Sequence, residues 1–203
     1  MIGFTWDSDI NWYAAKNAAT QNGDKLAQFV LHYKEECPNA EIRLVGHSLG
    51  TRIILNTLDS LYNNQLWAER GYKITSVHVM GAAVNPAELS VSSLYFGRPI
   101  ENVTLSFGNK FSPEDDVLEE VYYELENHRA LGEAGAENMG IYLPSNYDEE
   151  DVSTQISRDS DGDGDNDFPH LGDHHSGYIG IVRNGNVTSN GAMDRVVSDW
   201  RQN

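Results

Sequence analysis

The chain has a single cysteine, few basic residues and no long apolar stretch. Because Cys37 is alone among 203 residues, no disulfide bond can form within the chain. No segment approaches the ~20 consecutive apolar residues of a membrane-spanning helix. The amino terminus also lacks the basic segment and apolar core of a secretory signal. From these absences we expect a soluble, cytoplasmic protein.

Basic residues are scarce relative to acidic ones. Fourteen Lys and Arg stand against 31 Asp and Glu, which gives a net charge of −17. Nucleic acids and anionic membrane surfaces bind to basic faces, so this balance argues against both as partners. Molar salt shortens the Debye length to about 3 Å and removes the repulsion between the acids. We therefore expect a halophilic protein whose folding needs salt, with an acidic mesophilic protein as the alternative.

The apolar content of 39 % is enough for one sizeable core, so we expect a single domain over residues 1–203. Strand-like segments are expected at residues 1–7, 42–45, 74–80, 103–107 and 178–182. Helices are expected from Ser8 or Asp9 onward with a break at Asn22-Gly23, and at residues 51–58, 113–129 and 191–200. Residues 131–173 show little periodicity. Strands that alternate with helices predict a mostly parallel sheet with helices on both faces.

Residues 46–50 read Gly-His-Ser-Leu-Gly, the G-x-S-x-G pattern of a nucleophile elbow. A serine hydroxyl becomes a useful nucleophile when a tight turn exposes it to a base, and the flanking glycines allow such a turn. The expected helix start behind the motif directs free N–H groups at the site, which favours an oxyanion. The pattern predicts that Ser48 is a catalytic nucleophile.

This motif, together with residues 3–8 and the stretch from Asn22 to Ala27, resembles the α/β-hydrolase superfamily, in particular small hydrolases of halophilic archaea. The likeness covers most of residues 1–182. It implies a compact α/β-hydrolase fold and no cofactor. Strands that usually come first in this fold have no counterpart before residue 1, so we expect the amino-terminal strands to be reduced.

In α/β-hydrolases the acid and the histidine of the triad follow the serine in chain order, on loops after later strands. Asp115 comes soon after the expected strand that ends at Phe107. It is followed by one residue and then Val-Leu, which resembles the family pattern. Asp116 and Glu114 remain alternatives, and three acids before a helix also suit its N-terminal dipole.

The segment 173–178 is the strong candidate region for the base. In similar sequences the triad histidine directly precedes a serine, and this points to His175. His174 is the alternative, and two solvated loop histidines are the purely structural interpretation. The other histidines lie on expected helices or a strand, in the elbow, or outside the family context: His32, His78, His128, His47 and His170.

A triad of Ser48, Asp115 and His175 predicts hydrolysis of acyl esters. His175 takes the proton of the attacking serine, and Asp115 orients the imidazole and stabilises its cation. We expect an esterase or lipase-like enzyme that acts on a small acyl ester or a lipid. A noncatalytic binding or scaffold protein on the same fold is the alternative.

The backbone N–H of Leu49 is the expected first oxyanion donor, because it follows the nucleophile. By position, the second donor comes from the loop near Trp6 or Asp7. An acidic side chain there is unfavourable beside a developing negative charge.

Residues 159–167 alternate Asp with Ser, Gly and Asn in the manner of a calcium loop. His170 stands at the twelfth position, where a bidentate Glu belongs. A hydrated turn is therefore the favoured interpretation, and a structural calcium ion the weaker one. A calcium-stabilised surface module is a third candidate function, and it rests on this loop alone.

Overall fold

A parallel four-stranded sheet forms the centre of the structure, a computed structural model that describes residues 1–6, 11–92, 94–156, 173–183, 186–189 and 191–202. The strand order is β1-β2-β3-β4, and each neighbouring pair is parallel. The strands are β1 (Arg43–His47), β2 (Ser76–Met80), β3 (Phe107–Phe111) and β4 (Tyr147–Asp151). The chain has the α/β class predicted from the alternation of its elements.

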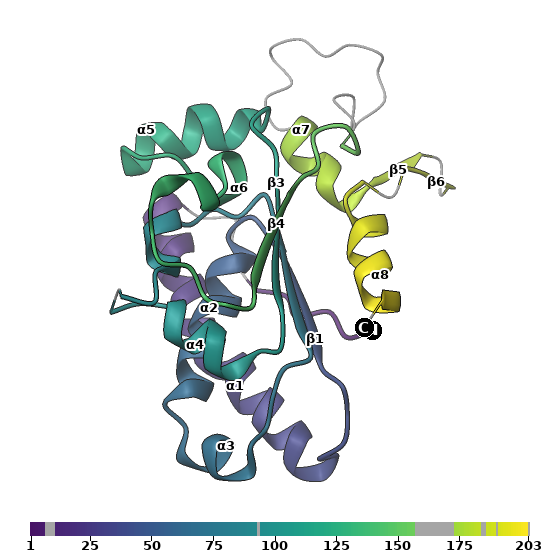
Figure 1. The fold of residues 1–203 in the computed structure, drawn as a ribbon. Coiled ribbons are helices and arrows are strands. Elements are labelled where there is room, and N and C mark those ends of the chain that lie inside the picture. The colour runs from purple at the N-terminus through teal and green to yellow at the C-terminus, as the bar shows by residue number, and fades with distance from the viewer. Residues whose placement is uncertain (7–10, 93, 157–172, 184–185, 190, 203) are drawn as a thin grey trace.

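Helices cover both faces of the sheet. Figure 1 shows α1 (Trp12–Glu36), α2 (Gly50–Tyr62) and α4 (Gly97–Val103) on one face and α8 (Met193–Gln202) on the other. The connections hold α3 (Gln65–Arg70), η1 (Pro86–Leu89), η2 (Val117–Tyr122), α5 (Tyr123–Glu126), α6 (Leu131–Ala134), η3 (Glu137–Met139), α7 (Asp173–Ser176) and η4 (Gly177–Ile179). A separate antiparallel pair consists of β5 (Ile181–Arg183) and β6 (Asn186–Ser189). Among the described helices, none has the length and apolar character needed to cross a membrane.

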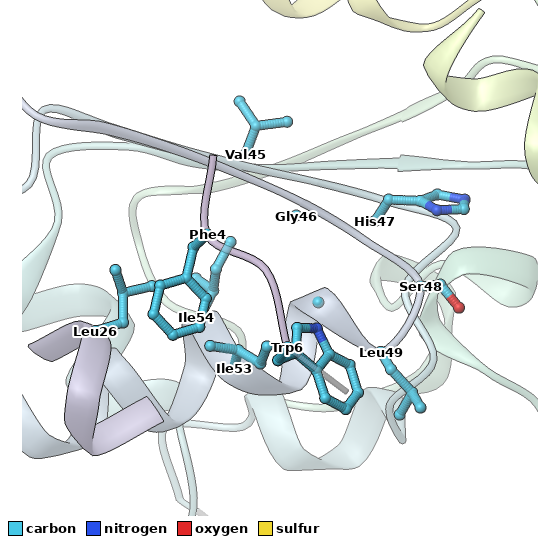
Figure 2. A pocket seen from close by; sticks show the side chains of 11 residues that line it. Phe4, Trp6, Leu26, Val45, Gly46, His47, Ser48, Leu49, Ile53 and Ile54 are labelled. Carbon is cyan, nitrogen blue, oxygen red and sulfur yellow. The ribbon is translucent and has the colours of Figure 1, made fainter. Parts of the chain in front are cut away.

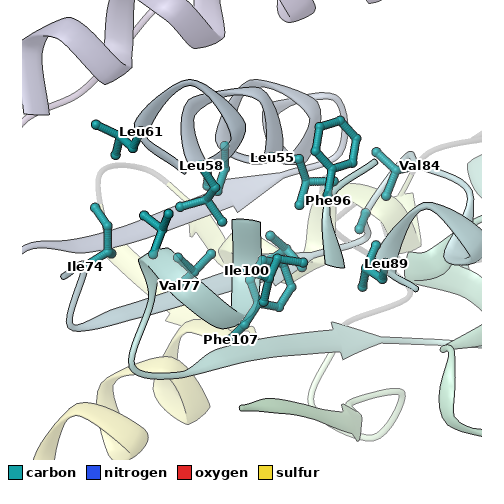
Figure 3. Close-up of a cluster of buried hydrophobic side chains, with 14 of the residues drawn as sticks. Leu55, Leu58, Leu61, Ile74, Val77, Val84, Leu89, Phe96, Ile100 and Phe107 are labelled. Atoms are coloured by element: carbon teal, nitrogen blue, oxygen red, sulfur yellow. The ribbon is translucent and has the colours of Figure 1, made fainter. Parts of the chain in front are cut away.

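The main core lies between α2, α4 and the sheet (Figure 3). Leu55 and Leu58 of α2 and Ile100 of α4 are fully buried, as are Val77 of β2 and Phe107 of β3. Burying such side chains stabilises the fold by about 1.5–3 kcal/mol each. This packing fixes α2 against the sheet, so its first turn lies at the carboxyl end of β1.

The first helix is continuous, and the break expected at Asn22-Gly23 is wrong. A Cβ at Gly23 would lie 2.4 Å from the Cβ of Asn56 on α2. Glycine there serves the close approach of two helices, and Thr57 donates to the Gly23 carbonyl at 3.1 Å. The helix begins after Asn11, whose side-chain oxygen accepts from the Ala14 N–H at 3.1 Å. The expected caps Ser8 and Asp9 lie outside the described residues.

The expected strand at residues 1–7 is not formed over 1–6. Phe4 and Trp6 instead line a pocket against β1 and α2. As a result, β1 pairs only with β2 and forms one edge of the described sheet.

The third strand begins where the sequence suggested that it ends. Val103 closes α4, and Thr104 donates to the Ile100 carbonyl at 2.8 Å, so the β-branched residues expected to form a strand terminate a helix. The strand in this region is β3. Its polar residues interrupt the apolar pattern by which a strand is predicted from sequence. Asn109 and Lys110 are buried there.

The fourth strand, β4, has an acidic sequence with no apolar alternation, and the sequence did not indicate it. Its pairing with β3 explains it. The Tyr147 ring stacks on Phe107 with centroids 6.1 Å apart, and Glu150 accepts from buried Lys110 at 2.9 Å. The backbone N–H groups of residues 136 and 137 donate to Glu149 at 2.7 and 3.1 Å.

Three further boundaries differ from expectation. The helix expected at 113–129 is a π-helical η2 followed by the short α5, which ends at Glu126, and Asn127 caps it with a φ of 58°. The segment 131–156 contains α6, η3 and β4, so it is more regular than expected. Tyr178 lies in η4 and the strand starts only at Ile181, because η4 packs Tyr178 into the core.

Ion pairs hold α8 over the second face of the sheet. Lys110 of β3 is buried and lies 2.9 Å from both Glu150 and Asp199. Arg195 of α8 contacts Glu150 at 2.8 Å. His78 of β2, 4 % exposed, lies 3.7 Å from Asp199. A titratable histidine is therefore enclosed beneath α8.

We expect this histidine to make the fold acid-sensitive. Burial lowers the pKa of His78 from 6.5 to about 4. Between these two values His78 is protonated in the unfolded chain but not in the folded protein. Its contribution to the free energy of unfolding is therefore complete above pH 6.5. It is lost on acidification, by up to about 1.4 kcal/mol per pH unit. Between about pH 7 and pH 4.5, the free energy of unfolding measured with urea should fall less steeply for His78→Gln than for the wild type, by up to this amount per pH unit. The exposed His32→Gln is the control, and equal slopes in all three proteins contradict the prediction.

Candidate active site

Ser48 lies in a sharp turn between β1 and α2. Its φ is 54°, a left-handed conformation that residues with a side chain rarely adopt. The Ser48 N–H donates to the Met80 carbonyl at 3.0 Å, which ties the turn to β2. A Cβ at Gly46 would lie 2.7 Å from Cδ1 of Ile54 and 3.2 Å from the backbone of Gly50. Strand, strained turn and helix are thus those of a nucleophile elbow.

His175 and Asp115 form a buried pair at the same end of the sheet. Nδ1 of His175 lies 2.8 and 3.0 Å from the two carboxylate oxygens, and Asp115 is fully buried. The Leu118 N–H also donates to this carboxylate at 3.0 Å. Because a carboxylate only accepts, Nδ1 of His175 carries a proton and Nε2 is the nitrogen left to act as a base.

The neighbouring candidates make other contacts. His174 binds the Glu114 backbone oxygen through Nδ1, and its Nε2 lies 3.4 Å from the Ser112 hydroxyl. The Asp116 side chain accepts from the Val117 N–H and caps η2. The structure thus joins His175 to Asp115, while His174 anchors α7 to the backbone of the loop that carries the acids.

His47, the residue before Ser48, contacts the backbone and the ring of His175. Its Nε2 donates to the His175 carbonyl at 2.8 Å, and the two ring centroids are 4.6 Å apart. Burial, and then the neighbouring His175, lower the pKa of His47 from 6.5 to about 4. His47 is therefore neutral at neutral pH.

A pocket of about 430 Å³ opens beside Ser48. Figure 2 shows Ser48 at one end and the side chains of Phe4 and Leu26 at the other. The lining residues are mainly apolar: Phe4, Trp6, Leu26, Val45, Leu49, Ile53 and Ile54, with Gly46, His47, Ser48 and Gly50 along the elbow. An apolar pocket next to a nucleophile suits an aliphatic group.

One of the two predicted oxyanion donors, the Leu49 N–H, adjoins Ser48 in this region. Leu49 immediately precedes the first turn of α2, where backbone N–H groups have no partner within the helix. Trp6 lines the pocket, whereas Asp7 lies outside the described residues. A second donor from their loop stays a prediction.

The segment that contains the elbow matches a known protein family. The family model described as Cutinase matches residues 5–113, more than half of the chain. The chain belongs to the cutinase family. This family consists of serine esterases with an α/β-hydrolase-type fold. No curated protein and no solved structure matches the chain.

The cutinase match includes Ser48 but ends before Asp115 and His175. It supports a serine hydrolase that acts on esters, and it leaves the acid and the base to be argued from geometry. The match does not bear on the resemblance to hydrolases of halophilic archaea, on salt adaptation or on a cytoplasmic location, which stay predictions. Residues 159–167 and His170 lie outside the described residues, so calcium binding there also stays a prediction.

Two residues that sequence patterns did not identify shape the cutinase-family site. Gly81, with a φ of 51°, follows β2, and a Cβ there would lie 3.2 Å from His175 and 3.3 Å from Asp115. Tyr178 is fully buried beside them and donates to the Gly132 carbonyl at 3.2 Å. Burial, and then the charge of Asp115, raise the pKa of Tyr178 well above its usual value. The available sequence signal was a glycine directly after an expected strand.

Proposed function

We propose that this member of the cutinase family hydrolyses acyl esters with a triad of Ser48, His175 and Asp115. The observation that carries the proposal is the hydrogen bond of His175 Nδ1 to the buried Asp115 carboxylate, at 2.8 Å. This bond selects the tautomer in which Nε2 is a base. His47 supports the placement of the serine, because it precedes Ser48 and its ring contacts that of His175.

The proposed reaction follows from these roles. Nε2 of His175 takes the Ser48 proton as the serine oxygen bonds to the acyl carbon. The resulting oxyanion accepts the Leu49 N–H, the alcohol leaves with the proton from His175, and an acyl-serine remains. Water then attacks the acyl carbon while His175 removes its proton, and the carboxylic acid leaves as His175 returns that proton to the Ser48 oxygen. Asp115 stays ionised throughout and stabilises the imidazolium.

The pocket indicates where the acyl chain binds. Its apolar part, formed by Phe4, Leu26 and Ile54 among others, lies beside the elbow that carries Ser48 (Figure 2). We infer that an aliphatic acyl chain or a lipid tail lies there. Each methylene moved from water into such a pocket contributes about 0.8 kcal/mol, or roughly fourfold in kcat/KM.

Labelling with alkyl fluorophosphonates tests the function and the acyl site together. We expect covalent modification of Ser48, located by peptide mass spectrometry, and no modification of Ser48→Ala. The second-order rate constant should rise about fourfold per added methylene until the pocket is filled. A rate that is independent of chain length refutes the acyl site and leaves the triad intact.

A noncatalytic binding or scaffold protein is the second candidate function. It is favoured by the unpaired edge of β1, where the described amino-terminal residues form no strand. The absence of one oxyanion donor lowers kcat by about 10²–10³-fold. An enzyme with only the Leu49 N–H as donor would therefore be slow. A folded protein that no fluorophosphonate labels would favour this alternative.

A further inference from the structure

We propose that His47 is a positioning residue for the reaction. It attaches the backbone of His175 to the end of β1, the strand that leads into Ser48. The proposal rests on the triad proposed above and adds a residue to it. Its basis is the contact between the elbow and α7, which the triad mechanism does not use.

The contact joins the two parts of the site that must not move apart. His47 ends β1 and adjoins Ser48, while His175 belongs to the four-residue α7, 128 residues further on. The bond from His47 Nε2 to the His175 carbonyl, 2.8 Å long, therefore connects the nucleophile strand directly to the backbone of the base. Tyr178 packs against both rings, with centroids 5.8 Å from His47 and 6.3 Å from His175.

The short helix α7 is thus attached to two separate parts of the structure. His174 binds the Glu114 backbone, and the His175 ring binds Asp115, so both side chains anchor to the loop after β3. The bond from His47 supplies the attachment to β1. With these anchors to β1 and to the loop after β3, α7 connects the strand that leads into Ser48 with the loop that carries Asp115.

The chemistry of the contact calls for a neutral donor. The His175 carbonyl can only accept, so His47 must carry its proton on Nε2. During the proposed reaction His175 becomes a cation, and a second cation with its ring centre 4.6 Å away would oppose that change. Neutral His47 provides the hydrogen bond without the charge, as a glutamine amide would.

The test compares variants that keep or remove this donor. His47→Phe retains an aromatic ring but cannot donate, whereas His47→Gln retains a neutral N–H donor. We expect His47→Phe to lower kcat for a short acyl ester by about 10²-fold with KM changed less than about twofold, because a small displacement of a reacting group has this effect. His47→Gln should recover most of the loss. His32→Phe, an exposed histidine on α1, is the matched control.

A proton NMR signal reads the same alignment without turnover. The Nδ1–H of His175 bound to Asp115 should give a far-downfield resonance in the wild type that Asp115→Asn abolishes. It should be broadened by exchange in His47→Phe and retained in His47→Gln. If His47→Phe does not fold, His47→Asn, whose amide is too short to reach the carbonyl, takes its place.

The outcomes separate the two proposals. An unchanged kcat and resonance in the donor-less variant overturn the positioning role, as does an equal loss in His47→Gln. If the wild type hydrolyses no ester and is not labelled, the proposed function fails. The resonance then decides alone whether His47 aligns His175, and its persistence in the donor-less variant overturns this inference.

Discussion

Ser48→Ala is expected to lower turnover of a short acyl ester by about 10⁶-fold, because removal of a triad nucleophile eliminates the acyl-enzyme route. The measurement is kcat with a chromogenic ester, at enzyme concentrations high enough to detect the residual rate. Alanine has the same Cβ as serine, so the φ of 54° costs both residues about the same strain. Thermal unfolding should therefore be nearly unchanged.

The control is Ser60→Ala, a half-buried serine near the end of the same helix that bonds to Asp24 of α1. It should retain full activity. Equal activity in Ser48→Ala and the wild type would show that the elbow does not supply the nucleophile. A loss in both variants would indicate that the mutations disturb α2 and not the chemistry.

Asp115→Asn is expected to lower kcat by about 10⁴-fold while the protein stays folded. The asparagine oxygen can still accept the hydrogen bond, 3.0 Å long, that the Leu118 N–H donates to Asp115 in the wild type. An amide N–H facing His175 Nδ1, however, favours the tautomer protonated at Nε2, and that tautomer cannot remove the serine proton. Activity assays and the downfield resonance described above measure both consequences.

The matched control is Asp116→Asn, which makes the same change one residue away. Its oxygen can still cap η2 at Val117, so activity should stay within about threefold of the wild type. The histidine pair gives the same contrast: His175→Ala should lose far more activity than His174→Ala. Similar losses within either pair contradict the assignment of the triad.

The sequence determined the features that short segments encode. Strand, glycine-flanked turn and helix around Ser48 lie within about twenty consecutive residues, so periodicity and turn chemistry predicted the elbow. Alternation of elements predicted the α/β class. For the acid and the base, resemblance favoured Asp115 and His175 but left their neighbours Asp116, Glu114 and His174 as alternatives.

Tertiary structure decided what depends on contacts between distant segments. Asp115 meets His175 across 60 residues, and His47 meets it across 128, distances at which local periodicity carries no information. The acidic β4 becomes a strand only because β3 offers it a partner, including the ammonium group of Lys110. Gly81 has no side chain, and this leaves room for His175 and Asp115 next to it. Its neighbours in the sequence do not indicate this requirement, because His175 and Asp115 come from distant segments.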